Sequence, residues 1–291
     1  MIERGSRLTE PGGELGLATR VLATWNTAAA FIKRDFLVAV SYKSAFVADV
    51  IGILFKVITF FYIGEVFGGA VASSLESFGG NYFAFLIIGI ALTDFVHTSL
   101  ENFATSIRDS QMTGTLEIVL LSPIRLPDLL VYSSLWAYIF TTFRFVVYVF
   151  FGAILFTLDV GGANVIAAAV ILLLTILCYA PLGIISATVI MVFKKGTWFR
   201  TGISAVSFLL GGVAYPVSVL PAWIGRLSFY VPMSHSVNGM REALLNGRSI
   251  LELRGDVLFL AVFAAILLPL AFFVFNLGLE KTKKMGTLTQ Y

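Results

Sequence analysis

The sequence has little of what a soluble enzyme usually carries. Only 13% of its residues are charged, whereas soluble domains average about 25%. Its one cysteine, Cys178, excludes a disulfide within the chain and leaves no cysteine pair for zinc. The sequence contains no G-x-x-x-x-G-K-[ST] motif, so the chain cannot bind ATP through a P-loop, and neither histidine lies in an H-E-x-x-H frame. No basic patch is interleaved with aromatic residues, which argues against a nucleic-acid partner.

Apolar residues are abundant instead. They make up 58% of the chain, with 27 Phe and a mean hydropathy of +0.92. A helical span of a bilayer needs about 20 apolar residues. The pattern predicts an all-α membrane protein with six transmembrane helices, at about 45–67, 82–106, 129–157, 164–193, 198–215 and 256–279. These would form one membrane domain over 45–279, between a flexible tail at 1–16 and a cytoplasmic tail at 280–291.

The distribution of Lys and Arg predicts the orientation. Six spans put both termini on the same side. The short loops near 68–81 and 158–163 contain no Lys or Arg, whereas the segments on the other side hold most of the cations. The positive-inside rule therefore places both termini in the cytoplasm, with the chain in the cell membrane. One loop, 216–255, departs from the rule, because it carries four arginines on the predicted outside: Arg226, Arg241, Arg248 and Arg254.

Before the first predicted span, residues 17–44 show an amphipathic pattern. Basic and polar residues occupy one side of the expected helix. Apolar side chains recur at intervals of three or four and form one stripe: Leu17, Val21, Trp25, Ala29, Ile32 and Phe36. This pattern is typical of a helix that lies in the membrane interface rather than across it. The alternative is a linker that happens to be helical.

Between the second and third spans, the stretch QMTGTLEIVLLSPIRLPDLL, residues 111–130, is too polar to cross a membrane. Its residues Leu116, Val119 and Leu120 nevertheless repeat at helical spacing. We therefore predict a cytoplasmic amphipathic helix over about 108–124. Two interpretations of this helix remain open: it lies on the membrane surface, or it docks in the groove of a partner protein.

The loop at 211–247 contains three prolines that forbid one continuous helix: Pro216, Pro221 and Pro232. Two apolar pieces remain, at about 219–230 and 234–245, and each is too short to span a bilayer. We expect two re-entrant or outer helices over about 217–247, in which Arg241 and the prolines form an outer gate. The alternative is a surface loop with two amphipathic turns.

The second predicted span carries ionisable residues at spacings of three and four: Asp94, His97 and Glu101. They share one helical face, which could form a metal or acid–base site. Lys56 in the first span and Arg144 in the third lie at a depth similar to that of Asp94. Charges at matched depth most simply pair, because an unpaired charge near the bilayer centre costs about 2.5–3.5 kcal/mol. A structural ion pair, a translocation path and a catalytic site remain the alternatives.

Two segments, in register with the six spans, carry a resemblance to a known family. MTGTLEIVLLSPIRLPDLL is similar to the cytoplasmic segment of the permease subunits of type-2 ABC exporters. AYPVSVLPAWIGRLSFYVPMSHSVNGMREALLNG resembles the proline and arginine signature of the same family. The resemblance covers nearly the full length of the chain. The sequence departs from the family pattern at Asn246 and at Ser234–His235.

The resemblance implies that the helix at about 108–124 is a coupling helix, seated in a cleft of a separate ATP-binding cassette subunit. Its apolar side chains would anchor it and its charges would orient it at the rim. The expected contact residues are Arg108, Leu116, Glu117, Val119, Leu120 and Arg125. The resemblance also implies a second permease copy, identical or similar. ATP and Mg²⁺ would bind the partner chain, with no cofactor and no metal on this one.

The sequence thus predicts an exporter subunit that is embedded in membrane lipid and is not itself an enzyme. Its expected cargo is a hydrophobic drug-like molecule or a lipid, and a lipid-linked polysaccharide is the alternative. Two hypotheses of other classes are an intramembrane enzyme built on Asp94, His97 and Glu101, and a membrane scaffold or channel without a motor. The coupling-helix pattern counts against the scaffold or channel.

Overall fold

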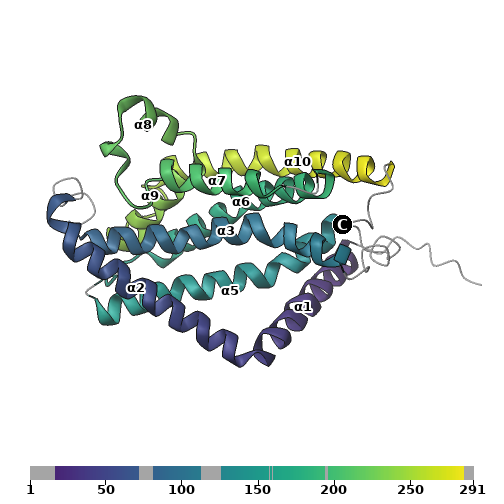
Figure 1. The fold of residues 1–291 in the computed structure, drawn as a ribbon, viewed down its shortest axis with the longest axis horizontal. Helices are drawn as coiled ribbons and strands as arrows, with labels where there is room; N and C mark the ends of the chain where they lie inside the picture. Colours follow the sequence, from purple (N-terminus) through teal and green to yellow (C-terminus); the bar gives the residue numbers. More distant parts are fainter. Residues whose placement is uncertain are drawn as a thin grey trace, which may run out of the picture.

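The computed structural model describes residues 17–71, 81–112, 126–156, 158, 160–193 and 196–284. All regular secondary structure in these residues is helical (Figure 1). The elements are α1 Leu17–Ser41, α2 Lys43–Val71, α3 Tyr82–Met112, α5 Leu126–Leu155, α6 Val165–Phe193, α7 Thr197–Leu210, the 3-10 turn η2 Val217–Val219, α8 Ala222–Ser228, α9 Pro232–Leu245 and α10 Arg254–Lys284. The prediction of an all-helical protein is confirmed for this part of the chain.

Five of these helices are long and apolar enough to cross a membrane, so the chain is a multi-pass membrane protein. The candidate spans are Lys43–Gly69, Tyr82–Ser106, Asp128–Leu155, Val165–Phe193 and Arg254–Thr282. They correspond to the first four and the last of the predicted spans.

The span predicted at 198–215 is not confirmed as one transmembrane helix. Its helix α7 has 14 residues and ends at Leu210. Gly211 and Gly212 follow, and Gly212 has a φ of +65°, a left-handed conformation that ends the helix. Pro216, which cannot donate a helical hydrogen bond, prevents the helix from resuming there. The crossing predicted at this place is therefore interrupted after Leu210.

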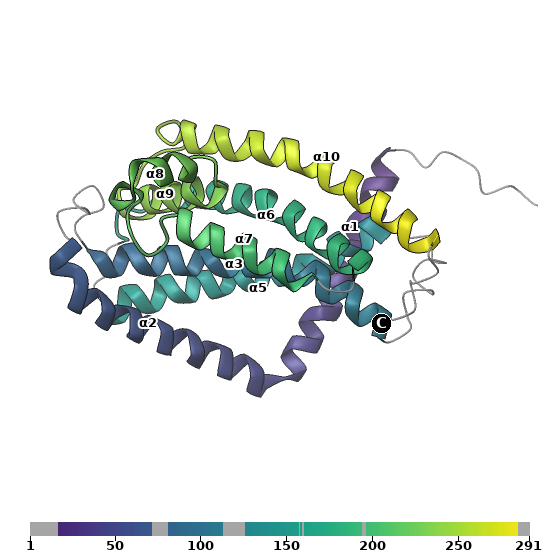
Figure 2. The same cartoon turned by 45° about the horizontal axis from the view of Figure 1, so that its top comes forward.

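Helix α3 lies at the centre of the bundle (Figures 1 and 2). It is the most buried of the five candidate spans, because α2, α5 and α6 pack around it, whereas α2 is the least buried. The main core contains Phe95 of α3, Tyr148 of α5, Tyr179 of α6 and Met240 of α9, all of which are buried. The bundle is thus organised around α3, and a charge on the buried part of α3 needs a partner inside the protein.

Helices α6 and α10 lie side by side and run in the same direction. The Cys178 thiol of α6 donates to the carbonyl oxygen of Leu260, early in α10, at 3.2 Å. Further along both helices, a Cβ at Gly278 of α10 would collide with the side chain of Thr188 of α6. Because the two helices are parallel, the chain between them must return to the starting end of the bundle, and α7 makes that return.

Helix α7 runs antiparallel to α3, beside α6 (Figure 2). Near its start, Arg200 pairs with Glu101 in the later part of α3, with 3.3 Å between nitrogen and oxygen. Beyond its end, the carbonyl oxygen of Ala214 accepts a hydrogen bond from the hydroxyl of Tyr82, the first residue of α3, at 2.9 Å. The short helix and the irregular segment after it therefore accompany α3 along most of its candidate span.

Helix α1 is separated from α2 by one residue, Tyr42, where the chain bends sharply (Figures 1 and 2). The helix predicted over 17–44 therefore ends at Ser41. Phe36 of α1 packs edge to face on Trp136 of α5, with 5.5 Å between ring centroids, whereas Trp25 is 72% exposed. Part of the predicted apolar stripe thus contacts α5, and part of it faces the surroundings of the protein.

Residues 216–245 form three short helical segments, each of which begins at a proline or directly after one. Pro216 and Pro221 directly precede η2 and α8, and Pro232 is the first residue of α9. Proline suits these places because neither the N-cap nor the first helical position needs an N–H donor for the helix. Helix α9 is buried along nearly its whole length, whereas α8 protrudes (Figure 1). The burial of α9 excludes, for this helix, a loop that lies on the surface.

Candidate functional site

A cluster of charged side chains joins three helices at the level of Asp94 in α3. The Nζ of Lys56, in α2, lies 3.8 Å from one carboxylate oxygen of Asp94, and Nη2 of Arg144, in α5, lies 3.4 Å from the other. The hydroxyl of Tyr148 donates to Asp94 at 3.3 Å. The Nε of Arg144 also lies 3.7 Å from Oδ2 of Asp49 in α2. Two cations thus face two carboxylates and connect α2, α3 and α5.

This Asp94 cluster accounts for the charges that interrupt the apolar helices. The formal charges of its two cations and two carboxylates cancel, so none is left alone where it would cost about 2.5–3.5 kcal/mol. Its contacts of 3.3–3.8 Å are longer than the 2.7–2.9 Å of close charge-assisted hydrogen bonds, so the pairs are loose. The side chain of Lys56 is 46% exposed and that of Asp94 only 13%. Nearly half of the Lys56 side chain is therefore accessible from outside the bundle.

His97 and Glu101, which lie about one and two turns after Asp94 in α3, do not join this cluster. Glu101 pairs with Arg200 of α7. The side chain of His97 is exposed. Among the residues that the structure describes, no three His, Cys, Asp or Glu side chains are grouped so that they could hold a metal ion. The three residues from which the sequence suggested an acid–base site therefore lie in three different surroundings.

The irregular backbone that follows α7 is held by side chains from neighbouring segments. A helix leaves its last carbonyl oxygens without helical partners, and buried backbone at membrane depth must find other donors. Here five carbonyl oxygens between residues 209 and 214 accept hydrogen bonds from side chains. The pairs are Tyr215 to Leu209 (2.6 Å), Ser234 to Leu210 (2.8 Å), Arg241 to Gly212 (2.9 Å) and to Val213 (2.8 Å), and Tyr82 to Ala214 (2.9 Å).

Arg241 lies at the centre of this junction. Its side chain is 3% exposed, and besides the carbonyls after α7 it donates to the carbonyl oxygen of Phe85 in α3, from Nε at 3.1 Å and from Nη2 at 2.8 Å. The guanidinium also lies over the ring of Phe85, with Cζ 3.2 Å from the ring centroid. A planar group with five donors can serve three carbonyls at once, which an ammonium group cannot do in the same geometry. Arg241 thereby joins α9 to the start of α3 and the end of α7.

A second polar junction, which the sequence did not predict, is formed by His235 of α9. Its Nδ1 lies 2.7 Å from Oδ1 of Asp256 in the first turn of α10, and its Nε2 lies 2.9 Å from the carbonyl oxygen of Phe229. The ring stacks on Phe259 with 3.9 Å between centroids. Asn238 donates to the other oxygen of Asp256 at 2.8 Å. In the sequence His235 stood out only as a departure from the family pattern, because its partners lie at 229, 256 and 259.

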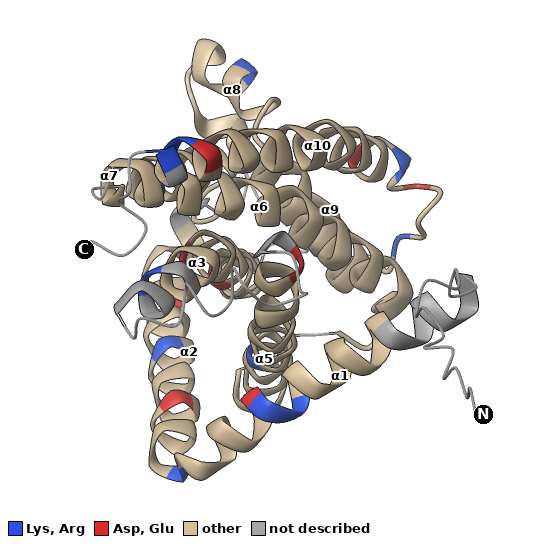
Figure 3. Cartoon of the chain, turned by 90° about the vertical axis from the view of Figure 1, so that its right-hand side faces the viewer, with Lys and Arg blue, Asp and Glu red and all other residues tan. Residues whose placement is uncertain are grey.

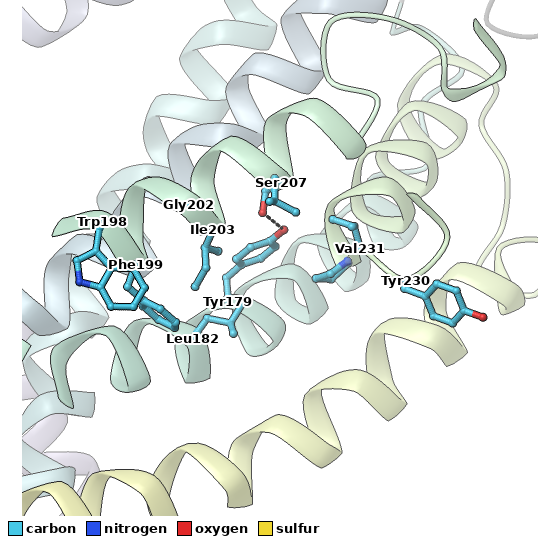
Figure 4. A pocket seen from close by; sticks show the side chains of 11 residues that line it. Tyr179, Leu182, Trp198, Phe199, Gly202, Ile203, Ser207, Tyr230 and Val231 are labelled. Atoms are coloured by element: carbon cyan, nitrogen blue, oxygen red, sulfur yellow. Dashed lines mark hydrogen bonds between the residues drawn. The ribbon is translucent and has the colours of Figure 1, made fainter. Parts of the chain in front are cut away.

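An apolar groove runs along α7, between α6 and the turn that joins α8 to α9 (Figure 4). We call it the α7 groove; its volume is about 340 Å³. The hydroxyl of Tyr179, at its base, donates to Oγ of Ser207 at 3.0 Å, so this buried pair satisfies itself. The other lining residues include Leu182, Trp198, Phe199, Ile203, Val206, Tyr230 and Val231. Such a lining suits an apolar or amphipathic molecule.

The predicted coupling segment can be placed only in part. Arg108 lies near the end of α3 and is exposed. Leu116, Glu117, Val119, Leu120 and Arg125 lie outside the described residues. The helices on either side, α3 and α5, end and begin at the same end of the bundle (Figures 1 and 2). The segment between Met112 and Leu126 therefore connects two helices at that end.

Comparison with known proteins adds a family relationship to this geometry. Residues 28–245, from within α1 to the end of α9, match the protein family described as ABC-2 type transporter. Nodulation protein J of Sinorhizobium fredii is 25% identical over 227 residues, which cover 76% of this chain and 82% of that protein. Nodulation protein J of Rhizobium leguminosarum bv. trifolii is 22% identical over 250 residues, or 81% and 83% of the two chains. The matched region includes the Asp94 cluster and Arg241.

Proposed function

Because this chain belongs to the ABC-2 type transporter family, we propose that it is the membrane-spanning subunit of an ATP-driven exporter. It moves a hydrophobic or amphipathic cargo outward, and a separate ATP-binding cassette subunit supplies the energy. As a permease component it carries the transport path rather than an enzymatic site.

The observation that carries this proposal is the interrupted crossing at α7. Transport proteins use broken helices next to the path, because irregular backbone at membrane depth is tolerated only inside protein or against a cavity. The end of α7 meets the first condition through Arg241 and its neighbours, and the α7 groove lies beside the helix. We propose that this junction, with Pro216, Pro221, Pro232 and Arg241, is the outer gate.

The proposed topology has six crossings. The parallel arrangement of α6 and α10 requires a return between them, and α7 with the segment to Ala214 provides it. Helix α1 then begins, and α10 ends, at the same end of the bundle, the end that faces the viewer in Figure 3. Basic segments of α1 and α10 are visible there. The positive-inside rule assigns this end to the cytoplasm.

The ATP-binding subunit would dock on the cytoplasmic side, against the connection between α3 and α5. In this proposal Leu116, Val119 and Leu120 anchor a coupling helix in a cleft of the ATP-binding subunit, and Arg108, Glu117 and Arg125 orient it. ATP and Mg²⁺ bind that subunit. Two permease copies, identical or similar, surround the path. Closure of the motors around ATP would push on these helices and open the path to the outside.

For the cargo we propose a hydrophobic drug-like molecule or a lipid, with a lipid-linked polysaccharide as the alternative. The α7 groove supports an apolar portion, since its lining is almost entirely aliphatic and aromatic. The half-exposed side chain of Lys56 would suit an anionic head group that passes the Asp94 cluster. Both sites lie on helices that pack around α3.

The test is a pull-down of the tagged full-length chain from native membranes in mild detergent, followed by mass spectrometry. We expect an ATP-binding subunit to co-purify. Leu116→Asp and Val119→Asp should reduce its recovery at least tenfold, because each puts a charge into the docked apolar face. Ser122→Asp is the matched control, since it adds the same charge at a position that is already polar.

Recovery of the ATP-binding subunit at the same level with all three variants would contradict the assigned coupling face. Absence of any ATP-binding subunit, under conditions that preserve other membrane assemblies, would overturn the exporter itself. Equal expression and monodispersity of the three variants must be verified first, so that a lost partner is not confused with a lost fold.

A further inference from the structure

A further apolar cavity shares no lining residue with the Asp94 cluster or with the α7 groove. It is about 580 Å³ in volume and lies where the bend between α1 and α2 meets α5. We call it the elbow groove. Neither the family relationship nor the proposed transport cycle assigns it a role.

Each of three helices contributes one face to the elbow groove. The lining positions in every helix follow the i, i+3, i+4 pattern of a single helical face. They are 36, 39 and 40 in α1, 43, 46 and 47 in α2, and 136, 139, 140 and 143 in α5. The eight residues from Trp136 to Phe143 extend about 10 Å along the axis of α5. The groove therefore runs lengthwise into the depth of the membrane, as an acyl chain does.

Aromatic rings form its wall. Trp136, Phe140 and Phe143 stack in succession along α5, with centroids 6.1 Å apart at each step, and Phe46 of α2 stacks on Phe143 at 5.8 Å. Although they line a cavity, several of its large apolar side chains are more than 40% exposed: Phe36, Val40, Phe46, Val47, Ile139 and Phe143. The groove is thus open at its side, toward whatever surrounds the helices.

The one charged side chain that lines the elbow groove is that of Lys43, the first residue of α2 and of its candidate span. A lysine at the end of a span lies at the level of the lipid head groups, and its stem can follow apolar surface while the ammonium group stays at the interface. Anionic lipids are enriched in the cytoplasmic leaflet, where each basic residue near the surface adds attraction. Charge and shape therefore point to the same kind of molecule.

We infer that the elbow groove binds one anionic phospholipid of the cytoplasmic leaflet. An acyl chain lies along the faces of α1, α2 and α5, and the phosphate group contacts the ammonium group of Lys43. The lipid fills the angle between α1 and α2 and so supports α1 in its bent position. This inference rests on the membrane orientation proposed above, and it is independent of the cargo and of the motor.

The test uses the full-length chain with Trp136 as its one tryptophan. Trp25, Trp198 and Trp223 are each more than 65% exposed, so Trp→Phe at these three positions should be tolerated. The protein is reconstituted in vesicles that contain either brominated phosphatidylglycerol or brominated phosphatidylcholine at equal mole fraction. Bromine quenches tryptophan fluorescence on contact. We expect the apparent affinity for the anionic lipid to be about fivefold higher, corresponding to about 1 kcal/mol from one lysine.

Two variants identify the contacts. Lys43→Gln should reduce the affinity for phosphatidylglycerol to that for phosphatidylcholine, whereas Lys281→Gln, the same charge loss at the end of α10, should leave the preference intact. Ala39→Phe, which fills the groove, should weaken quenching by both lipids. Helix content and elution volume show whether each variant is folded.

Equal quenching by the two lipids in the unsubstituted protein would overturn the role of the acidic head group. Quenching by neither lipid would show that protein, such as a second copy of the chain, covers the groove, and it would overturn the inference altogether.

Discussion

Nη2 of Arg241 and the carbonyl oxygen of Val213 are 2.8 Å apart, although they come from α9 and from the irregular segment after α7. The same guanidinium holds the carbonyl oxygens of Gly212 and Phe85. One side chain thus fixes the place where an incomplete crossing meets the central helix. This junction gives the outer gate that we propose a defined structural basis.

Replacing Arg241 should destabilise the protein strongly. Arg241→Met leaves the carbonyl oxygens of Gly212 and Val213 buried without their donor, at about 1–3 kcal/mol each. Arg241→Lys keeps the charge but not the planar fork, so its loss should be intermediate. The free energy of unfolding in mild detergent is the measurement. Arg248→Met is the control, because Arg248 forms a half-exposed pair with Glu242 at 3.0 Å and should matter by less than about 1 kcal/mol. Equal losses at 241 and 248 would contradict the assignment.

Gly89 permits the close approach of α3 to the end of α7. A Cβ at this position would lie 2.5 Å from the carbonyl oxygen of Val213 and 2.8 Å from Nη2 of Arg241. We expect Gly89→Ala to lower the free energy of unfolding by about 1–3 kcal/mol through overpacking. Gly52→Ala in α2 is the matched control, since a Cβ there meets nothing within 4 Å and alanine favours the helix. In thermal unfolding, Gly89→Ala should lower the Tm and Gly52→Ala should raise it. A raised Tm for Gly89→Ala would refute the close contact.

The Asp94 cluster predicts an order of effects within α3. Asp94→Asn removes the carboxylate that faces Lys56 and Arg144, and should cost about 2.5–3.5 kcal/mol. Glu101→Gln breaks only the more exposed pair with Arg200 and should cost less than about 1 kcal/mol. Adding Lys56→Met to Asp94→Asn should recover part of the loss, because one uncompensated cation is then removed. Unfolding of the single and double variants tests this order, and an additive double variant would speak against the pair.

Glu252, in the turn before α10, predicts a local dependence on pH. Hydrogen bonds from the Ser249 hydroxyl and backbone N–H hold the pKa of the Glu252 carboxyl below its ordinary value. A carboxyl with a lowered folded-state pKa stabilises the turn above the unfolded-state pKa of about 4.3, and this contribution is lost as the pH falls through the folded-state value. The protection factor of the Ser249 amide, measured by hydrogen exchange, should fall below about pH 4. In Glu252→Gln it should be low at neutral pH and nearly constant over the same range.

The sequence indicated the long helices because membrane-spanning segments satisfy their backbone hydrogen bonds within themselves and show this as apolar runs. The same logic failed for 198–215, where an apolar composition concealed the break after Leu210. Gly211, Gly212 and Pro216 are the signal of this break in the sequence, because glycine and proline are the residues that most often end a helix. The short helices between residues 217 and 247 were predicted from three prolines and from the two short apolar pieces between them, since proline restricts the backbone whatever surrounds it.

Depth along a helix also allowed Lys56, Asp94 and Arg144 to be considered together, since it follows from counting residues. The depth of a residue could not show that Asp94 and Glu101 have different partners. The partner of each depends on which helix packs on which side of α3. The partners of His235 and the walls of the two grooves were likewise invisible, since they combine residues from three or more separate segments.

The sequence by itself determined that the chain is helical, that it lies in a membrane and to which family it is similar. These properties follow from local composition and from short motifs, and they do not depend on how the helices are arranged. Only the tertiary structure decided that Arg241 closes the end of α7 on Phe85, 156 positions away in sequence, and that the bend at Tyr42 opens a groove against α5. The physical reason is that a buried polar group is satisfied by whichever donors packing brings within about 3 Å, and packing is a property of the whole bundle.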